Sequence, residues 1–192
     1  YHKWKEVAGM LPEFDIAGRT VLITGAGRGI GKSVALVMAE AGADVAVTGL
    51  TEVNAANVAQ GIRNLGRRGL GLAADATRLP DMEHVVEQVL GEFGHLDVLI
   101  NCVGDSIPGS VARMPNRAAK WTSEIDWHQI LDVNLTQAFI TCHAFGPHML
   151  ERGTGCVINV SSFAGLRARA DMAAYSAAKA GLIRFTESLA LE

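Results

Sequence analysis

The chain has 192 residues, of which 49% are hydrophobic and 19% are charged. At about 150 residues per domain, this length predicts a single folded domain over residues 1–192, and the composition excludes a disordered or coiled-coil chain. Seventeen basic residues stand against 20 acidic ones, which gives a net charge of −3. The chain therefore lacks the excess of lysine and arginine that nucleic-acid binding requires.

The cysteines, the histidines and the apolar runs limit which cellular compartment and which cofactors the sequence allows. Cys102, Cys142 and Cys156 match neither a disulfide framework nor a metal or redox spacing. The six histidines are scattered, so we expect no metal site. The N-terminal segment lacks the apolar stretch of a secretory signal, and the longest uncharged run, 133–150, contains polar side chains that are costly in a membrane. These features predict a cytoplasmic protein without a membrane span.

Strand-like and helix-like segments alternate along the chain. Five short runs rich in valine, isoleucine and leucine have the two-sided apolar character of buried parallel strands, at 20–24, 44–48, 69–73, 97–101 and 156–160. Segments with helical spacing lie at 31–41, 51–65, 80–93, 125–151 and 173–192. This alternation predicts an α/β fold with a doubly wound parallel sheet and right-handed crossovers.

One connection is much longer than the others. Residues 104–124 separate the fourth strand from its helix by several times the usual length of such a loop. Ligands of open parallel sheets bind beyond the carboxyl ends of the strands, which is where this loop begins. We expect it to cover a substrate; a surface insertion without function is the alternative.

The densest glycine cluster lies between the first strand and the first helix. Gly25, Gly27, Gly29 and Gly31 fall within residues 24–31. Main-chain N–H groups at a helix N-terminus attract anions, and residues without a Cβ let a pyrophosphate approach closely. The spacing G-x-G-x-x-G is absent, whereas G-x-x-x-G-x-G is matched. We expect a dinucleotide phosphate site here; a purely structural turn is the alternative.

A phosphate-binding P-loop is the strongest rival interpretation of this cluster. Lys32 and Ser33 follow Gly31, as the P-loop pattern requires, but Ala26 stands where that pattern has its first glycine. The cluster alone does not decide between the two, so the later motifs must.

The end of the second strand bears on the choice of dinucleotide. An acidic residue there would bind the adenosine ribose and repel a 2′-phosphate, whereas a basic residue would favour that phosphate. Residues 48–51, which include Leu50, contain neither. Because Arg28 lies within the glycine turn, the sequence slightly favours NADP over NAD.

A tyrosine and a lysine lie four residues apart at the start of the last helix. The spacing places Tyr175 and Lys179 on one face, about one turn apart. An ordinary tyrosine has a pKa near 10 and is a poor acid or base at neutral pH, but a neighbouring ammonium stabilises a phenolate. Such pairs arise by chance on exposed helices. Ser161, Ser162 and Asn134 upstream make chance less probable here.

Together these motifs resemble the short-chain dehydrogenase/reductase family, in its standard single-domain form. The resemblance covers about residues 17–192 and settles the P-loop question, because a P-loop protein has no reason to carry the other motifs. The matching motifs are Gly25-x-x-x-Gly29-x-Gly31, Asp75, Asn101-Cys-Val-Gly104, Asn134, Ser162 and Tyr175-x-x-x-Lys179. The resemblance implies a Rossmann-like fold.

The resemblance also implies four catalytic residues. Tyr175 would exchange a proton with the alcohol or carbonyl oxygen, and Lys179 would bind the nicotinamide ribose and stabilise the phenolate. Ser162 would hydrogen-bond the reacting oxygen, with Ser161 structural. Asn134 would hold a water molecule, at a local irregularity of its helix.

For the cofactor, the resemblance implies that Asp75 accepts a hydrogen bond from the adenine amino group, while backbone around Ala76, Asn101 and Gly104 lines the dinucleotide. The expected cofactor-binding residues are Gly25, Gly27, Arg28, Gly29, Ile30, Gly31, Leu50, Asp75, Ala76, Asn101, Gly104, Tyr175 and Lys179.

Two departures from the family pattern stand out. Cys102 and Val103 replace the usual asparagine and alanine of the fourth-strand motif, from which we expect a slightly shifted but competent cofactor wall. In addition, the last helix runs to residue 192, where the family continues with further strands and substrate-covering helices. We therefore expect a chain truncated at its C-terminus.

The resulting hypothesis is an NAD(P)-dependent oxidoreductase that interconverts a secondary alcohol and a ketone. A non-catalytic dinucleotide-binding or scaffold protein of the same fold is the alternative. By analogy with the family we expect a homo-oligomer, a tetramer or dimer, formed through the helices near Val133 and Leu182.

Overall fold

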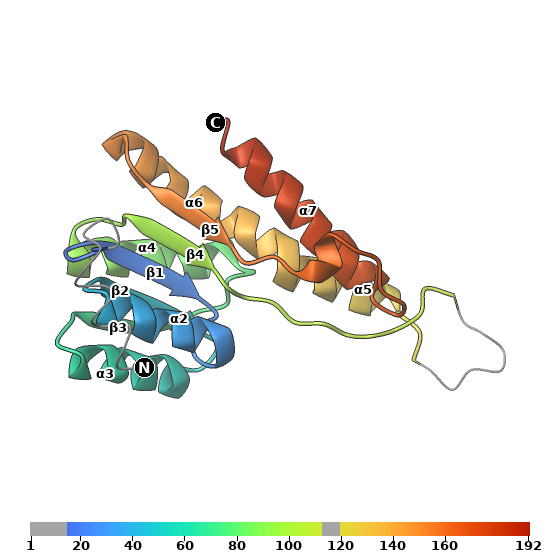
Figure 1. Ribbon diagram of the computed structural model, residues 1–192, viewed down its shortest axis with the longest axis horizontal. Helices are drawn as coiled ribbons and strands as arrows, with labels where there is room; N and C mark the ends of the chain where they lie inside the picture. Colours follow the sequence, from blue (N-terminus) through green and yellow to red (C-terminus); the bar gives the residue numbers. More distant parts are fainter. Residues whose placement is uncertain (1–14, 113–119) are drawn as a thin grey trace.

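The computed structural model describes residues 15–112 and 120–192. Within them, a five-stranded parallel sheet has the order β3-β2-β1-β4-β5 (Figure 1). The strands are β1 (Thr20–Thr24), β2 (Asp44–Gly49), β3 (Gly69–Ala73), β4 (Val98–Asn101) and β5 (Cys156–Asn159). All the predicted strands are present, and their ends differ from the prediction by no more than one residue.

Helices cover both faces of this sheet, which confirms the doubly wound α/β fold. They are α2 (Gly29–Glu40), α3 (Glu52–Asn64), α4 (Leu79–Phe93), α5 (Glu124–Leu131), α6 (Gln137–Arg152) and α7 (Ala173–Leu189). Successive side chains of a strand point to opposite faces. In β1, Val21 and Ile23 therefore pack with α2 and α3, whereas Leu22 packs with α4 and α6.

The sheet brings the predicted site segments to one edge. Thr24 at the end of β1 pairs with Asn101 at the end of β4, and Asn101 pairs with Asn159 of β5. Strand order reverses at β1, since β2 and β4 lie on its two sides. The carboxyl edge at such a reversal is where open α/β sheets bind ligands.

The helix predicted over 125–151 is interrupted. A π-helical segment, Asp132–Thr136, separates α5 from α6. The Asn134 side-chain amide donates to the main-chain oxygen of Ile130, four residues earlier, at 2.8 Å. This bond occupies a carbonyl that the regular helix would use, and single π turns of this kind often occur at functional sites. The irregularity that the family resemblance implied at Asn134 is present.

The long connection after β4 leaves the sheet and runs out beside α5 and α7 (Figure 1). This connection is attached to the segment before α7, because the Gly109 N–H donates to the main-chain oxygen of Asp171 at 2.8 Å. Ser110 and Trp121 form an isolated bridge across it. Part of the predicted loop, 113–119, lies outside the described residues.

Helix α7 crosses α5 and the π-helical segment, and its C-terminal half diverges from α6 (Figure 1). It ends at Leu189, slightly before the predicted end at residue 192. Within the described parts of the chain, no helix is both long and apolar enough to cross a membrane.

Candidate active site

The glycine turn between β1 and α2 is formed as the sequence predicts. Gly25 and Gly29 have φ values of +66° and +59°, which residues with a Cβ rarely adopt. A Cβ on Gly31 would lie 2.8 Å from both the Cα of Ala26 and the main-chain oxygen of Gly25. The turn therefore folds tightly on itself, and only glycine allows it.

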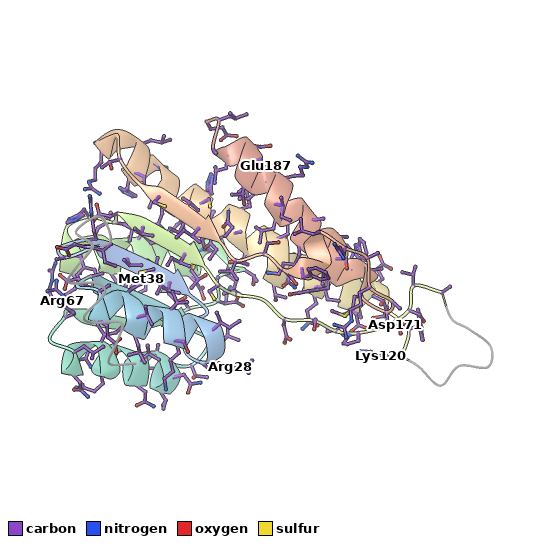
Figure 2. The ribbon with its side chains drawn as sticks, viewed as in Figure 1. Arg28, Met38, Arg67, Lys120, Asp171 and Glu187 are labelled. Carbon is purple, nitrogen blue, oxygen red and sulfur yellow. The ribbon has the colours of Figure 1, made fainter. Side chains whose placement is uncertain are left out.

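The start of α2 leaves its main-chain N–H groups available to a ligand. Arg28 occupies the N-cap position without a side-chain capping bond, and no acidic residue lies in the first turn. Arg28, Gly29 and Ile30 are exposed, and Figure 2 shows Arg28 at this end of α2. Uncapped N–H groups and the helix dipole together favour an anion such as a pyrophosphate.

The serine that a P-loop would use lies in α2, one turn after Gly29. Ser33 Oγ donates to the main-chain oxygen of Gly29 at 3.2 Å, one turn earlier in α2. This intrahelical bond is the ordinary one for serine in a helix.

The end of β3 holds Asp75 in a defined orientation. Both the main-chain N–H and the hydroxyl of Thr77 donate to Asp75 Oδ1, at 2.9 and 2.7 Å. The carboxylate of Asp81 accepts from the Asp75 N–H at 3.0 Å. Asp75 and Thr77 border a cavity of about 520 Å³ whose other wall is α5 and the π-helical segment, including His128 and Val133. The neighbouring Ala76 is buried.

At the end of β4, the side chain of Asn101 is committed to the interior. Its Oδ1 accepts from the Thr141 hydroxyl at 2.6 Å, and its Nδ2 donates to Asn159 Oδ1 at 2.8 Å. Both ends of the Asn101 side chain are thus bonded within the protein, which leaves only the main chain of this residue for a ligand. The Cys102 N–H donates to Thr24 Oγ1 at 3.3 Å, which ties β4 to the end of β1.

Lys179 is buried at the centre of the site. It is 3% exposed, its Nζ lies 5.8 Å from the centre of the Tyr175 ring, and it donates to the main-chain oxygen of Val160 at 2.9 Å. Burial lowers the pKa of this ammonium. The predicted pair on α7 therefore lies together, with the ammonium withdrawn from solvent.

Asn134 and Gly104 complete the surroundings of this ammonium. Asn134 is fully buried, and its Nδ2 also donates to the main-chain oxygen of Asp105 at 2.7 Å. Its Oδ1 has no hydrogen-bond partner among the described residues. A Cβ on Gly104 would lie 3.0 Å from that oxygen and 3.2 Å from Lys179 Nζ. Asn134, Gly104 and Lys179 thus meet at one point.

Ser162 lies on the loop that follows β5. Its Oγ accepts from the Ala164 N–H at 3.2 Å and caps the short 3₁₀ turn Phe163–Gly165. The preceding residue, Ser161, donates its hydroxyl to the main-chain oxygen of Lys179 at 2.9 Å. The loop of Ser162 is therefore attached directly to the helix that carries the tyrosine–lysine pair.

Sequence reasoning missed the main-chain groups of this site. The carbonyl oxygens of Val160 and Asp105 hold Lys179 and Asn134, and no side-chain pattern could have revealed them. Nor did it find the cavity of about 910 Å³ between α6, β5 and α7, whose wall includes Phe139 and Phe185. None of the predicted site residues lines that cavity.

The thiols of Cys102 and Cys142, which lie near the end of β4, are poor nucleophiles. Burial raises the pKa of Cys142 to about 11 and also raises that of Cys102. Since the thiolate is the reactive form, both side chains stay largely unreactive at neutral pH.

Comparison with protein families gives one match over most of the chain. The model described as short chain dehydrogenase matches residues 19–192. The chain belongs to the short chain dehydrogenase family. This confirms the resemblance seen in the motifs.

Curated relatives in this family include 3-oxoacyl-[acyl-carrier-protein] reductases. The FabG protein of Vibrio cholerae is 36% identical over 178 residues, which are 93% of this chain and 68% of that protein. The Escherichia coli protein is also 36% identical, over 91% of this chain and 67% of its own length.

Solved structures of short-chain dehydrogenases share the fold. A putative short-chain alcohol dehydrogenase from Sinorhizobium meliloti is 34% identical, with a TM-score of 0.84 over 93% of this chain and 68% of that one. An NAD⁺-bound xylitol dehydrogenase is 29% identical, with a TM-score of 0.83 over 91% of this chain and 65% of its own. The Rossmann-like sheet with flanking helices is thus common to all of them.

Proposed function

We propose that this short-chain dehydrogenase interconverts a secondary alcohol and a ketone by hydride transfer with NAD(P)(H), with Tyr175 as general acid and base. The observation that carries the proposal is the buried ammonium of Lys179, 5.8 Å from the centre of the Tyr175 ring. Burying an ammonium costs free energy, and a role for its charge beside Tyr175 accounts for that cost.

The residues at the carboxyl edge suit a nicotinamide dinucleotide. The uncapped start of α2, beside Gly25 and Gly29, would hold the pyrophosphate. Asp75, oriented by Thr77, would accept from the adenine amino group. Gly104, without a side chain, leaves the ammonium of Lys179 open to a ribose hydroxyl.

Each catalytic side chain has a defined task in this proposal. When bound, the nicotinamide donates or accepts a hydride at the reacting carbon. Tyr175 exchanges a proton with the oxygen on that carbon, and the Ser162 hydroxyl hydrogen-bonds the same oxygen. Lys179 stabilises the phenolate form of Tyr175 by its charge. Asn134 Oδ1, buried and unpartnered within the described residues, would accept from a water molecule that returns the proton.

NADP is the cofactor that we favour over NAD. Arg28 is exposed at the glycine turn, and Leu50 and Thr51 follow β2 without a carboxylate. A 2′-phosphate would meet the guanidinium of Arg28, which binds phosphate oxygens well. The next residue, Glu52, lies in the first turn of α3 and is the one acidic group close to this segment in sequence.

A 3-oxoacyl thioester is one ketone that the proposal includes, in line with the names of the FabG relatives. Xylitol dehydrogenase and 7α-hydroxysteroid dehydrogenase, both similar in structure, are named for alcohol substrates, and the second is described in complex with NADH and a 7-oxo steroid acid. We further propose a cytoplasmic homo-oligomer, a tetramer or dimer that associates through α7 and the helices around Val133.

The test uses NADH and NADPH with a panel of ketones and secondary alcohols, and compares the native chain with Tyr175→Phe. We expect turnover by the native chain and a loss of at least about a hundredfold in the variant, the range of general acid–base catalysis. Tyr1→Phe makes the same change at the only other tyrosine and serves as the control. Cofactor binding without turnover of any substrate would support the non-catalytic alternative instead.

A further inference from the structure

Two adjacent residues hold Lys179 from the loop after β5. The main-chain oxygen of Val160 accepts from Lys179 Nζ at 2.9 Å, and the hydroxyl of Ser161 donates to the main-chain oxygen of Lys179, also at 2.9 Å. Val160 thus binds the ammonium of Lys179, and Ser161 binds the main chain of the same lysine.

We propose that Ser161 is a positioning residue, which fixes the loop after β5 on α7 so that Val160 keeps the ammonium of Lys179 beside Tyr175. The proposal rests on the proposed function, in which Lys179 acts on Tyr175. It assigns Ser161 a part in the reaction that its sequence position does not indicate.

The hydroxyl bond is not needed to satisfy the carbonyl that it joins. Lys179 lies inside α7, where its main-chain oxygen accepts from the N–H four residues later. The Ser161 hydroxyl therefore adds a second bond to an oxygen that already has one. Its effect is to fix the distance between the loop and the helix.

A third contact joins the same loop to the same residue. A Cβ on Gly165 would lie 2.8 Å from the carbonyl carbon of Lys179 and 2.9 Å from its oxygen. The 3₁₀ turn Phe163–Gly165 therefore lies directly on the α7 backbone at this residue. Ser162 sits between Ser161 and this turn, so the contacts on either side of it also fix its position relative to α7.

Both attachments matter because the lysine side chain is long and flexible. Four rotatable bonds lie between its Cα and Nζ, and a free ammonium would sample many positions. With its main chain held by Ser161 and its Nζ held by Val160, the ammonium is restricted to one region, 5.8 Å from the Tyr175 ring centre. The Val160 N–H donates to the main-chain oxygen of Asn101 at 3.0 Å, so β4 holds this residue on one side and Ser161 holds the loop on the other. Loss of the Ser161 bond leaves the Val160 carbonyl held from β4 alone, and its direction toward Lys179 Nζ can change.

The test compares Ser161→Ala with Ser161→Thr, which retains the hydroxyl, and with a control on the same helix. Thr186 Oγ1 donates to the main-chain oxygen of Leu182 at 2.7 Å and accepts from Asn159 Nδ2, at the end of β5, at 2.9 Å. Thr186→Val therefore removes a hydroxyl that joins α7 to the end of β5 without contacting Lys179. Melting temperatures of all the variants are measured so that stability losses can be compared.

The first readout does not depend on activity. Each protein is reductively methylated with formaldehyde and a borohydride, and the labelling rate of Lys179 is followed by peptide mass spectrometry against the exposed Lys32 and Lys120. We expect Lys179 to be labelled about two- to tenfold faster in Ser161→Ala, the ratio that one hydrogen bond supports. Ser161→Thr and Thr186→Val should retain the native rate.

The second readout is the kinetics. In Ser161→Ala, kcat should fall about two- to tenfold, as the labelling rate rises, while KM for the ketone changes little. The midpoint of the pH–rate profile should also move. Three results would each overturn the proposal. They are a native labelling rate and native kinetics in Ser161→Ala, labelling of Lys179 as fast in Thr186→Val as in Ser161→Ala, and a Ser161→Thr variant that behaves like Ser161→Ala. If the native chain turns over no substrate, the proposed function fails, while the labelling rates still decide whether Ser161 holds Lys179.

Discussion

Lys179 and Gly104 approach each other so closely that a Cβ on Gly104 would lie 3.2 Å from the lysine Nζ. The same Cβ would lie 3.0 Å from Asn134 Oδ1. These separations are shorter than ordinary contacts between a Cβ and its neighbours. Because Nζ is also bonded to Val160, it has little freedom to withdraw.

Gly104→Ala should therefore impair catalysis more than folding. We expect kcat/KM to fall about tenfold, since a displacement of well under 1 Å at reacting groups is costly. Gly91→Ala is the matched control, because Gly91 lies exposed in α4 and a Cβ there meets nothing within 4 Å. The control should be as active as the native chain and up to about 1 kcal/mol more stable. Equal activity of the two variants would contradict the close approach.

Lys179→Met should separate the charge of this residue from its bulk. Methionine fills a similar volume without the ammonium, so we expect kcat to fall by about a hundredfold or more while the fold persists. Burial lowers the pKa of Lys179, which means that the folded state disfavours its charged form. The variant should consequently be no less stable than the native chain in urea unfolding near neutral pH. Retention of native kcat would show that the ammonium is dispensable.

Arg28→Ala tests the cofactor preference. If the exposed guanidinium meets the 2′-phosphate, the Kd of NADPH should rise about tenfold or more, because a charged hydrogen bond is worth roughly 1.5–3 kcal/mol. The Kd of NADH, which lacks that phosphate, should change much less. Isothermal titration with each cofactor gives both values. A parallel weakening of both would place Arg28 at the shared pyrophosphate instead, and unchanged values would exclude it from the site.

Asp97 should make stability depend on pH. Burial by itself would raise its pKa, but the Thr20 N–H, the Arg152 guanidinium and His95 outweigh this and lower the pKa below its usual value. The stability that this carboxylate contributes is present above the unfolded-state pKa of about 3.9 and is lost as the pH falls through the lower folded-state value.

Asp97→Asn should therefore destabilise the fold by roughly 1–3 kcal/mol at pH 6 and by less at pH 3. Urea unfolding of both proteins at the two pH values measures the difference. Activity should be unchanged, since Asp97 precedes β4 at the amino edge of the sheet, opposite the candidate site. A stability difference that grows on acidification would contradict the assignment.

Much of the fold could be predicted because local sequence and global structure agree. The run Thr20–Thr24 is buried along its whole length, and its two-sided apolar character is sufficient to predict a central parallel strand. The break in the helix at Asn134 was less accessible. It depends on one side-chain amide that bonds two main-chain oxygens, of Asp105 and Ile130, and only the family resemblance suggested it.

For the candidate site, residue types could be predicted but not their attachments. Tyr175 and Lys179 follow from a spacing of four on one helix. The contact of Lys179 with Val160 joins segments nineteen residues apart through a main-chain oxygen, which carries no sequence signal. The family resemblance implied a structural role for Ser161, and its bond to the backbone of a residue eighteen positions away likewise carries no sequence signal.

The hydride that passes from the nicotinamide to the substrate can be followed with a deuterium label. The native chain is incubated with NADPH deuterated at the transferable position of the nicotinamide and with any ketone that consumes it, and the alcohol formed is examined by mass spectrometry. Hydride transfer with Tyr175 as the proton donor predicts one deuterium on the carbinol carbon, with product formation greatly slowed in Tyr175→Phe. Cofactor consumption without deuterium in the product, or an equal rate in Tyr175→Phe, would contradict it.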